Sequence, residues 1–138
     1  MQQTTLIIFK PDSIQKNLVG EILARFQKEG FAIAGTKMIK MTDELLRDHY
    51  AHVLDKPFFP GLVSYMTSSP VIVLALRGEE VINRVREMLG PTDSQKAPKG
   101  TLRGDYGEDV TVNLAHASDS PETARVELAR FFAQSEIF

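Results

Sequence analysis

The stretch Val71–Leu76, with the sequence VIVLAL, constrains the fold most directly. An unbroken apolar run of this length is typical of a β-strand that is covered on both of its faces. Pro70 precedes the run and marks its start. We therefore predict a strand over residues 71–76 with other elements packed on both sides of it.

Residues on either side of this strand predict the remaining elements. Residues 4–9 (TTLIIF) are expected to form a strand that ends in a turn at Lys10-Pro11-Asp12-Ser13, and Thr42 and Ser120 are expected to cap helices. The expected strands cover residues 4–9, 31–41, 71–76 and 110–114; the expected helices cover residues 18–29, 42–50, 61–67, 79–89 and 121–132.

This order of elements predicts an α+β fold. It contains the split βαββαβ arrangement of ferredoxin-like folds, with a four-stranded antiparallel sheet and helices packed on it. The helices within residues 42–67 are then insertions, and residues 90–109 form a long loop. Loops of this length in compact domains are usually functional or disordered. We expect residues 1–138 to form one domain of this kind.

The composition excludes several kinds of chemistry. Without cysteine there is no thiolate nucleophile, redox CxxC motif or zinc ribbon, so a nucleophile must be Ser, Thr, His, Lys or a carboxylate. The formal net charge is -2, whereas proteins that bind nucleic acid usually carry a basic excess, so nucleic acid is an unfavoured partner. Neither a P-loop nor a GxGxxG motif occurs. Any phosphate ligand would therefore be held mainly by side chains.

The apolar stretches are short. The longest, residues 71–76, is far below the roughly 20 residues that cross a bilayer. The first ten residues contain no basic segment followed by a long apolar one. We expect a cytoplasmic protein with no membrane partner.

His116 is the strongest candidate for a reactive group. It follows Val110, Val112 and Leu114 at a period of two, so we expect it on the apolar face of the last strand, where that strand ends. A histidine on an apolar face is most often a core residue with a satisfied hydrogen bond. The alternative is a nucleophile, because a carboxylate such as Glu127 could hold one ring nitrogen and leave a lone pair on the other.

Three cations could accompany this histidine. Lys10 ends the first strand, Arg86 lies on the helix after the third strand, and Arg103 lies in the long loop. Each alone is typical of a solvated surface charge. The ends of the first and last strands can meet in this fold, so we expect Lys10 near His116, and guanidinium groups suit phosphate oxygens.

His49 and His52 offer a competing interpretation. They stand three residues apart on an expected helix and could begin a metal site, but structural zinc needs four ligands. A partly buried pair that faces the neighbouring layer is the simpler interpretation.

The residues around His116 also resemble a known family. Asn113–Ser120 (NLAHASDS) is similar to the nucleoside diphosphate kinase motif NxxHGSDS, which surrounds a phosphorylated histidine. The similarity covers residues 4–132 and includes IIFKPD, HYAHVLDKPFFPGLVSYM, MLGPTDS and KGTLRGDYG. Ala117 departs from the motif, since the family usually has glycine there. If that backbone were left-handed, alanine would cost about 1 kcal/mol.

The resemblance implies a reaction at His116. Its Nδ1 would attack the γ-phosphorus of a nucleoside triphosphate and form phosphohistidine, which would pass the phosphoryl group to a nucleoside diphosphate. Glu127 would hold the other ring nitrogen, and Ser118 would brace Glu127. The kinetics would be ping-pong.

Further residues would contact the nucleotide if the resemblance holds. Lys10 and Tyr50 would lie beside the transferred group, and Lys10 and Asn113 would reach the ribose 3′-hydroxyl. Phe58 would stack on the base and leave its edges unread, which implies tolerance of purines and pyrimidines. The residues that would bind the phosphates are Arg86, Thr92 and Arg103.

The resemblance also implies the cofactor and the assembly. Mg²⁺ would arrive on the phosphates of ATP or another nucleotide, with no metal held by protein side chains. Members of the family are oligomers. The chain stops soon after Phe132, as in short bacterial forms, so we expect a homotetramer rather than a hexamer or a dimer.

Two other function classes use the same features. A non-catalytic nucleotide-binding or regulatory module would bind in the same cleft without needing His116. A single-strand nucleic-acid binder would use the sheet, but residues 4–9 and 71–76 lack its typical aromatic pattern and the charge balance is unfavourable.

Overall fold

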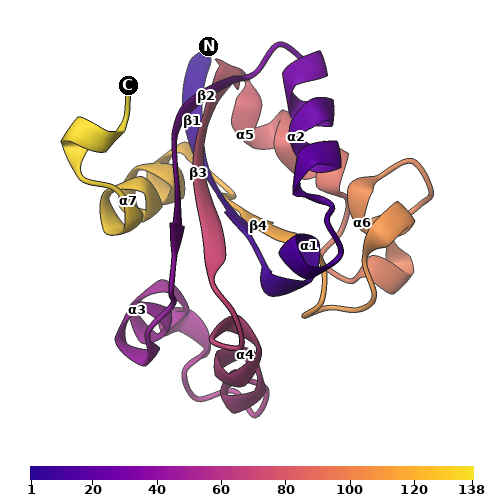
Figure 1. Cartoon of the computed structure of the whole chain (residues 1–138), viewed down its shortest axis with the longest axis vertical. Helices are drawn as coiled ribbons and strands as arrows, with labels where there is room; N and C mark the ends of the chain where they lie inside the picture. The colour runs from indigo at the N-terminus through magenta and orange to yellow at the C-terminus, as the bar shows by residue number, and fades with distance from the viewer.

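A computed structural model describes residues 1–138 as one four-stranded antiparallel sheet with helices on both faces (Figure 1). The strands lie in the order β2-β3-β1-β4, which is the order of a ferredoxin-like fold and confirms the predicted fold class. Their bounds are Gln2–Phe9 for β1, Ala32–Ile39 for β2, Val71–Glu79 for β3 and Ala115–Ala117 for β4.

The two faces of the sheet are covered by different helices. In Figure 1, α2 and α5 lie on one side of the strands and α7 lies on the other, while α3 and α4 extend from one end of the sheet. The longer helices are α2 (Val19–Lys28), α3 (Asp43–His49), α4 (Phe59–Met66), α5 (Val81–Leu89) and α7 (Pro121–Phe131). The short ones are α1 (Pro11–Gln15), α6 (Leu102–Tyr106) and three 3-10 turns, Ala51–Val53, Ser94–Lys96 and Gln134–Glu136.

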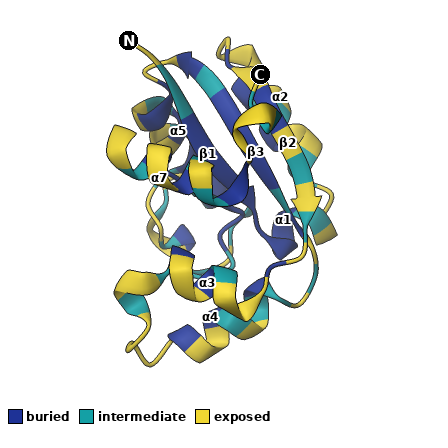
Figure 2. Cartoon of the chain, turned by 90° about the vertical axis from the view of Figure 1, so that its left-hand side faces the viewer, coloured by how far each residue is buried: buried dark blue, intermediate teal, exposed yellow.

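The apolar stretch at residues 71–76 lies within β3, between β2 and β1, as its composition predicts. Leu74 and Leu76 belong to the core under α2 and α5, whereas Val73 and Ala75 belong to the core on the opposite face. Figure 2 shows this central part of the sheet as buried. Because both faces are covered, each fully buried Val or Leu side chain here stabilises the fold by about 1.5–3 kcal/mol.

The expected helix caps are present. The side chain of Thr42 accepts a hydrogen bond from the backbone N–H of Leu45 at the start of α3, and that of Ser120 accepts one from Thr123 at the start of α7, both at 3.1 Å. Gly30 follows α2 with a φ of 87°, a conformation that glycine adopts without steric cost. The sequence therefore places these helix ends correctly.

Two expectations about the second half of the chain are wrong. Residues 110–114 do not form a strand, and β4 consists only of Ala115–Ala117. The loop over residues 90–109 is not irregular throughout, because it contains a 3-10 turn and α6. Elements of three to five residues are too short to show a periodic pattern, which is why the sequence does not reveal them.

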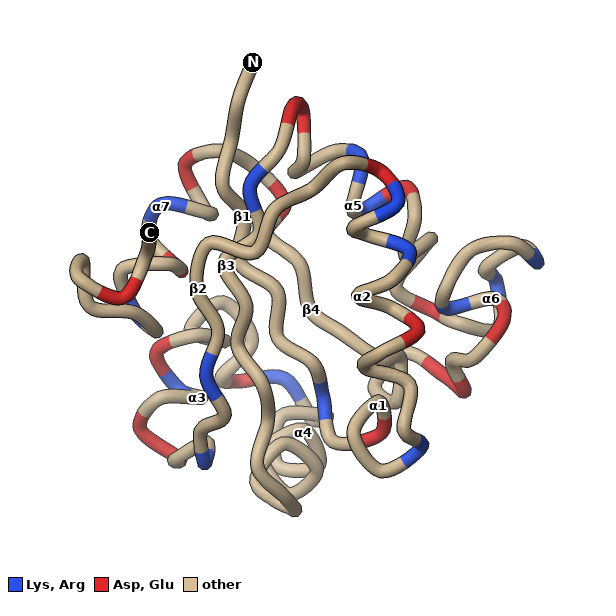
Figure 3. Tube along the Cα trace, turned by 45° about the horizontal axis from the view of Figure 1, so that its top comes forward, with Lys and Arg blue, Asp and Glu red and all other residues tan.

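No helix combines the length with the apolar character that a bilayer-spanning segment requires. Figure 3 shows Lys and Arg interspersed with Asp and Glu around the helices and loops. This mixing agrees with the nearly balanced composition of 16 basic and 18 acidic residues.

Candidate active site

His116 lies in the middle of β4, directly opposite Ile8 of β1. Residues that are opposite in an antiparallel pair point to the same face, and Ile8 belongs to the core on the α7 side. The His116 side chain is 21% exposed, so it is neither sealed in the core nor free on the surface. The imidazole is therefore half-buried between the sheet and α7.

The predicted alternation from Val110 to His116 is wrong. Leu114 packs in the core under α2 and α5, which is the face opposite to His116, and Val110 is 57% exposed. Leu114 has a φ of 78°, and the N–H of Ala115 donates to the carbonyl of Asn113 across it at 3.0 Å. This γ-turn with positive φ is a strained conformation that interrupts the extended backbone.

A carboxylate from α7 holds one ring nitrogen of His116. The Nε2 atom of His116 lies 3.0 Å from Oε1 of Glu127. The hydroxyl of Ser118 donates to the same oxygen at 2.7 Å and accepts the backbone N–H of Leu6 at 3.2 Å. Burial alone would raise the pKa of Glu127, but the hydrogen bonds from His116 and Ser118 outweigh it and hold that pKa below its usual value. Glu127 is therefore an ionised acceptor.

This hydrogen bond determines the protonation pattern of His116. An ionised carboxylate accepts only, so the proton of a neutral imidazole lies on Nε2. The lone pair then lies on Nδ1, which makes no hydrogen bond within the chain. The arrangement gives a nucleophilic nitrogen that is held in one orientation.

Lys10 contacts the residues that lead into β4, because β1 pairs with β4. It directly follows β1, and its backbone N–H donates to the carbonyl of Leu114 at 2.9 Å. Its ammonium donates to Oδ1 of Asn113 at 2.8 Å and to the carbonyl of Thr111 at 3.2 Å. Burial, together with the nearby positive charge of Arg103, lowers the pKa of Lys10 to about 8.

Asn113 is almost fully buried, and both the nitrogen and the oxygen of its side-chain amide are hydrogen-bonded. Its Nδ2 donates to the carbonyls of Thr92 at 2.9 Å and Val110 at 3.1 Å, while its Oδ1 accepts from Lys10. Asn113 therefore joins the long loop to the strand ends. Thr92 itself is exposed in that loop.

Arg103 is buried at the start of α6 and bonds mainly to the backbone. Its Nε, Nη1 and Nη2 atoms donate to the carbonyls of Asn113, Gly90 and Ala115 at 3.1, 3.0 and 2.7 Å. Burial, and then the nearby charge of Arg86, lowers the pKa of Arg103 to about 10. Only the remaining N–H groups of its guanidinium are available to a phosphate.

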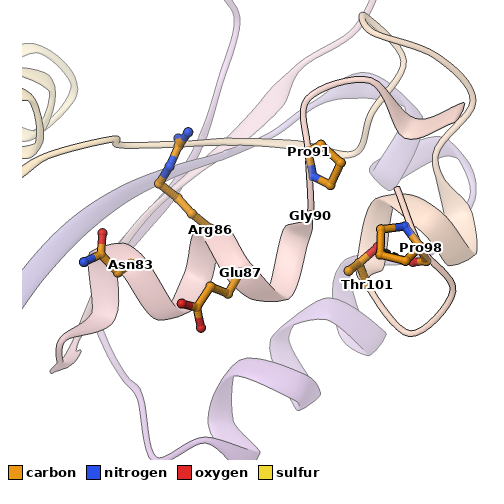
Figure 4. Close-up of a pocket in the computed structure, with 7 residues that line it drawn as sticks. All are labelled: Asn83, Arg86, Glu87, Gly90, Pro91, Pro98 and Thr101. Carbon is orange, nitrogen blue, oxygen red and sulfur yellow. Dashed lines mark hydrogen bonds between the residues drawn. The ribbon is translucent and has the colours of Figure 1, made fainter. Parts of the chain in front are cut away.

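Arg86 is exposed and makes fewer hydrogen bonds within the chain than Arg103 does. Its Nη1 donates to the carbonyl of Ala117 in β4 at 3.3 Å. Arg86 also borders an open groove of ≈ 520 Å³ (Figure 4). The residues that line this groove are Asn83, Arg86, Glu87, Gly90, Pro91, Pro98 and Thr101. His116 and Lys10 do not line it, so the groove is separate from the cluster around the imidazole.

Tyr50 and Phe58 come from the inserted helical segment. The ring of Tyr50 packs edge-on against His49, with centroids 4.7 Å apart, and burial raises the pKa of its hydroxyl. Phe58 directly precedes α4 and is 55% exposed, which leaves its ring accessible for stacking.

His49 does not pair with His52. His52 is exposed, whereas His49 is buried against His116 with ring centroids 4.6 Å apart. Donor atoms of His49, His116 and Glu127 lie within 4.8 Å of one another. Nη1 of Arg130 lies 2.9 Å from Nδ1 of His49, and its positive charge opposes a second cation at this place.

Sequence reasoning missed three residues that support the site. The carboxylate of Asp12 accepts the backbone N–H of Leu114 at 3.0 Å and the hydroxyl of Tyr65 at 2.5 Å, so it anchors the strained turn. Arg130 binds His49. Asp12 belongs to the quoted stretch IIFKPD, which could have indicated it, but nothing in the spacing of Tyr65 or Arg130 does.

The backbone at Ala117 shows no conformational penalty for alanine. Residues other than glycine with positive φ are Asn17, Glu80 and Leu114, and Ala117 is part of β4. The cost of about 1 kcal/mol that a left-handed alanine would carry therefore does not apply.

Comparison with known proteins identifies close relatives over the whole chain. The family model described as nucleoside diphosphate kinase matches residues 3–137. The nucleoside diphosphate kinase of Parabacteroides distasonis is 49% identical over 136 residues, which cover 99% of this chain and 89% of that protein. That of Pelotomaculum thermopropionicum is 50% identical over 137 residues, which cover 99% and 91%.

Solved structures agree with the sequence matches. The nucleoside diphosphate kinase of Aquifex aeolicus superposes with a TM-score of 0.94 at 43% identity, with 100% of both chains covered. The nucleoside diphosphate kinase of Halobacterium salinarum, solved in complex with CDP, gives a TM-score of 0.96 at 40% identity over 100% of this chain and 92% of that one. As the motif around His116 predicts, the chain belongs to the nucleoside diphosphate kinase family.

Proposed function

We propose that this chain transfers the terminal phosphoryl group of a nucleoside triphosphate, with ATP as a donor, to a nucleoside diphosphate through a phosphohistidine on His116. The observation that carries the proposal is the 3.0 Å contact between Nε2 of His116 and Oε1 of Glu127. It favours a lone pair on Nδ1 of an imidazole that is 21% exposed. Membership of the nucleoside diphosphate kinase family supports the same reaction.

The first half-reaction forms one bond and breaks one. Nδ1 donates its lone pair to the γ-phosphorus, the bond between that phosphorus and the bridging oxygen breaks, and the electron pair leaves on the nucleoside diphosphate. The imidazole becomes positively charged, and Glu127 stabilises that charge through Nε2–H. In the second half-reaction an oxygen of another diphosphate attacks the phosphoryl group and His116 returns to its neutral form.

Cations supply the charge stabilisation that phosphoryl transfer requires. We assign phosphate binding to Arg86, the free N–H groups of Arg103 and the hydroxyl of Thr92. Lys10 and Tyr50 lie beside the transferred group in this proposal, and Lys10 with Asn113 contacts the ribose 3′-hydroxyl. Losing one such charge-assisted contact costs on the order of 2–4 kcal/mol in the transition state.

Mg²⁺ enters as part of the substrate in this proposal. The donor atoms that gather in the chain are two imidazoles and one carboxylate, whereas Mg²⁺ takes oxygen ligands and keeps several waters. That donor set does not suit Mg²⁺, but the phosphate oxygens of a nucleotide do.

Base recognition would depend on stacking rather than on hydrogen bonds to the base edges. Phe58 is 55% exposed, and a stacked aromatic ring accepts the face of any base. We therefore propose that purine and pyrimidine nucleotides are both substrates. A cytoplasmic location fits these substrates.

We propose a homo-oligomer, with a tetramer favoured over a hexamer or a dimer. Support for association comes from β2, which lies at the edge of the sheet and exposes Ile33 and Met38 by 44% and 57%. An exposed edge strand with apolar side chains is suited to pairing with a second copy.

Labelling tests the reaction. ATP labelled at its γ-phosphate should label the wild-type protein in a bond that is stable in alkali and lost in acid, and adding unlabelled CDP or GDP should remove the label. His116→Ala should take up no label. His52→Ala is the matched control, because His52 is exposed and its loss should leave labelling unchanged. Labelled His116→Ala would contradict the proposal; nucleotide binding without label on the wild type would favour a regulatory module.

A further inference from the structure

His49 is a buried histidine beside the reactive one. Its side chain is 1% exposed and lies edge-on to the ring of His116, with centroids 4.6 Å apart at 82°. Phe131 of α7 packs against it with centroids 5.3 Å apart. A second imidazole at this distance is a potential competitor for the hydrogen-bond partners of the first.

Arg130 determines which nitrogen of His49 carries the proton. Its Nη1 lies 2.9 Å from Nδ1 of His49, and its Nε donates to Oδ2 of Asp48 at 3.0 Å. A guanidinium is always protonated and donates only, so Nδ1 of His49 must be the acceptor. His49 is therefore neutral with its proton on Nε2, and Asp48 fixes the orientation of the guanidinium.

The neutral form matters because of the carboxylate that both histidines approach. Nδ1 of His49 lies 3.9 Å from Oε2 of Glu127, while Oε1 of Glu127 is bonded to His116 and Ser118. Without a proton on Nδ1, His49 cannot donate to Glu127. With one, it would compete with His116 for that carboxylate, and a charged His49 would also neutralise it.

The charged and titratable groups around His49 come from three segments. They are His116 on β4, Glu127 and Arg130 on α7, and Asp48, Tyr50 and His52 on the segment of His49 itself. Burial, the neighbouring His116 and then Arg130 and His52 together lower the pKa of His49 to about 3, against the opposing effect of Glu127. The surroundings thus favour the uncharged ring.

We propose that Arg130 is a positioning residue for the phosphoryl transfer, because its hydrogen bond keeps Nδ1 of His49 unprotonated, so that His116 is the only histidine that donates a ring N–H to the Glu127 carboxylate. This inference rests on the proposed function. Arg130 contacts neither the reacting nitrogen nor a substrate group, and acts through His49 and Glu127.

Arg130→Met tests the inference, since methionine retains an apolar side chain and removes the donor. Without Arg130, Nδ1 of His49 no longer faces a donor, and the ring proton is expected to move from Nε2 to Nδ1, from which it can donate to Glu127. His49 stays uncharged, because burial and His116 contribute most to its low pKa, so the effect does not depend on pH. We expect the rate of His116 labelling by ATP to fall about tenfold relative to wild type at both pH 6 and pH 8, with a proton on Nδ1 of His49 in nitrogen-15 NMR of the variant. Arg130→Lys, which restores a charged donor, should recover most of the rate and the unprotonated Nδ1.

Arg125→Met is the matched control on the same helix, because Arg125 is exposed and makes no ion pair. It should show the wild-type rate at both pH values. A slow Arg130→Met variant in which Nδ1 of His49 is still unprotonated, or no recovery in Arg130→Lys, would mean that Arg130 is merely structural and would overturn the inference.

A second measurement does not depend on any variant or on activity. Nitrogen-15 NMR of the wild-type imidazoles should show His49 with its proton on Nε2 and an unprotonated Nδ1 from pH 6 to pH 8. A protonated Nδ1 on His49 would overturn the inference even if Arg130→Met failed to fold. Absence of label on the wild type would instead count against the proposed function, while the NMR result would still report on Arg130 and His49.

Discussion

The chemistry of His116 depends on which of its two ring nitrogens carries the proton. Glu127 accepts from Nε2, and Ser118 donates to the same carboxylate oxygen, so the pair fixes both the ring and its lone pair. Ser118 is held in turn by the backbone of Leu6. The reactive group is therefore oriented by α7 and β1 together.

Glu127→Gln tests the contribution of the negative charge. The amide oxygen can still accept from Nε2, but it no longer stabilises a positively charged imidazole. We expect the rate of His116 phosphorylation to fall about tenfold to hundredfold. Rapid-quench labelling would measure this rate, and Ser118→Ala should have a smaller effect because the charge remains. A Glu127→Gln variant with the wild-type rate would contradict the assigned role.

We predict that activity is lost at alkaline pH, because Lys10 loses its proton there. Its pKa is lowered to about 8, so in the free enzyme the ammonium loses its proton as the pH rises through that value. Because phosphate binding needs the cation, kcat/KM should decrease above pH 8. At saturation the bound phosphates favour the charged lysine, so kcat should decrease only at higher pH.

Steady-state pH profiles with CDP as acceptor would separate the two parameters. Lys10→Arg is the comparison, since arginine remains charged over this range and should move the limb of kcat/KM to higher pH. If kcat/KM of Lys10→Arg decreased at the same pH as that of the wild type, the titrating group would be a residue other than Lys10.

Among the elements, the loop over residues 90–114 depends on Arg103 more than the sequence suggests. The guanidinium bonds three carbonyls, from Gly90, Asn113 and Ala115, and so joins the end of α5 to the start of β4. Arg86, which the sequence groups with it, makes one backbone hydrogen bond at 3.3 Å. The two arginines therefore differ in their contribution to stability.

Replacing each arginine by methionine should separate these roles. Arg103→Met leaves buried carbonyls without their donor and should lower the free energy of unfolding by about 2–3 kcal/mol. Arg86→Met should change it by less than about 0.5 kcal/mol while raising KM for the nucleotide. Urea denaturation would measure the first quantity. Equal destabilisation by both substitutions would contradict the distinction.

The turn at Leu114 shows where sequence periodicity fails. Alternation predicted a strand from Val110, yet one residue with a φ of 78° ends the extended backbone and moves His116 to the face opposite Leu114. The backbone N–H of Leu114 is held by Asp12, which is distant in sequence. Because the strain is maintained by tertiary contacts, no local pattern reveals it.

For the molecule as a whole, the predicted four-stranded antiparallel sheet with helices packed on it is confirmed, because it follows from long apolar patterns. Residues 71–76 are buried on both faces as expected, and Lys10 reaches the neighbourhood of His116 through the pairing of β1 with β4. The side-chain hydrogen bonds that support the site from a distance in sequence were not predicted. The bond between Arg130 and His49, for example, joins residues 81 positions apart.

We predict that copies of this chain associate through the outer edge of β2. This strand pairs with β3 on one side, accepts the backbone N–H of Phe138 at the carbonyl of Ala34, and exposes Met38 by 57%. Sedimentation velocity at micromolar concentration should show an oligomer, for which we expect a tetramer. Met38→Lys places a charge on that edge and should shift the distribution to smaller species. A monomeric wild type would contradict the expectation.

The position of the phosphoryl group on the imidazole ring is the decisive measurement. Glu127 occupies Nε2 of His116 and leaves Nδ1 to react. Phosphorus-31 and nitrogen-15 NMR of the phosphorylated protein should therefore show the phosphoryl group on Nδ1 of His116. Phosphorylation at Nε2, or at a residue other than His116, would contradict the role assigned to Glu127 and His116.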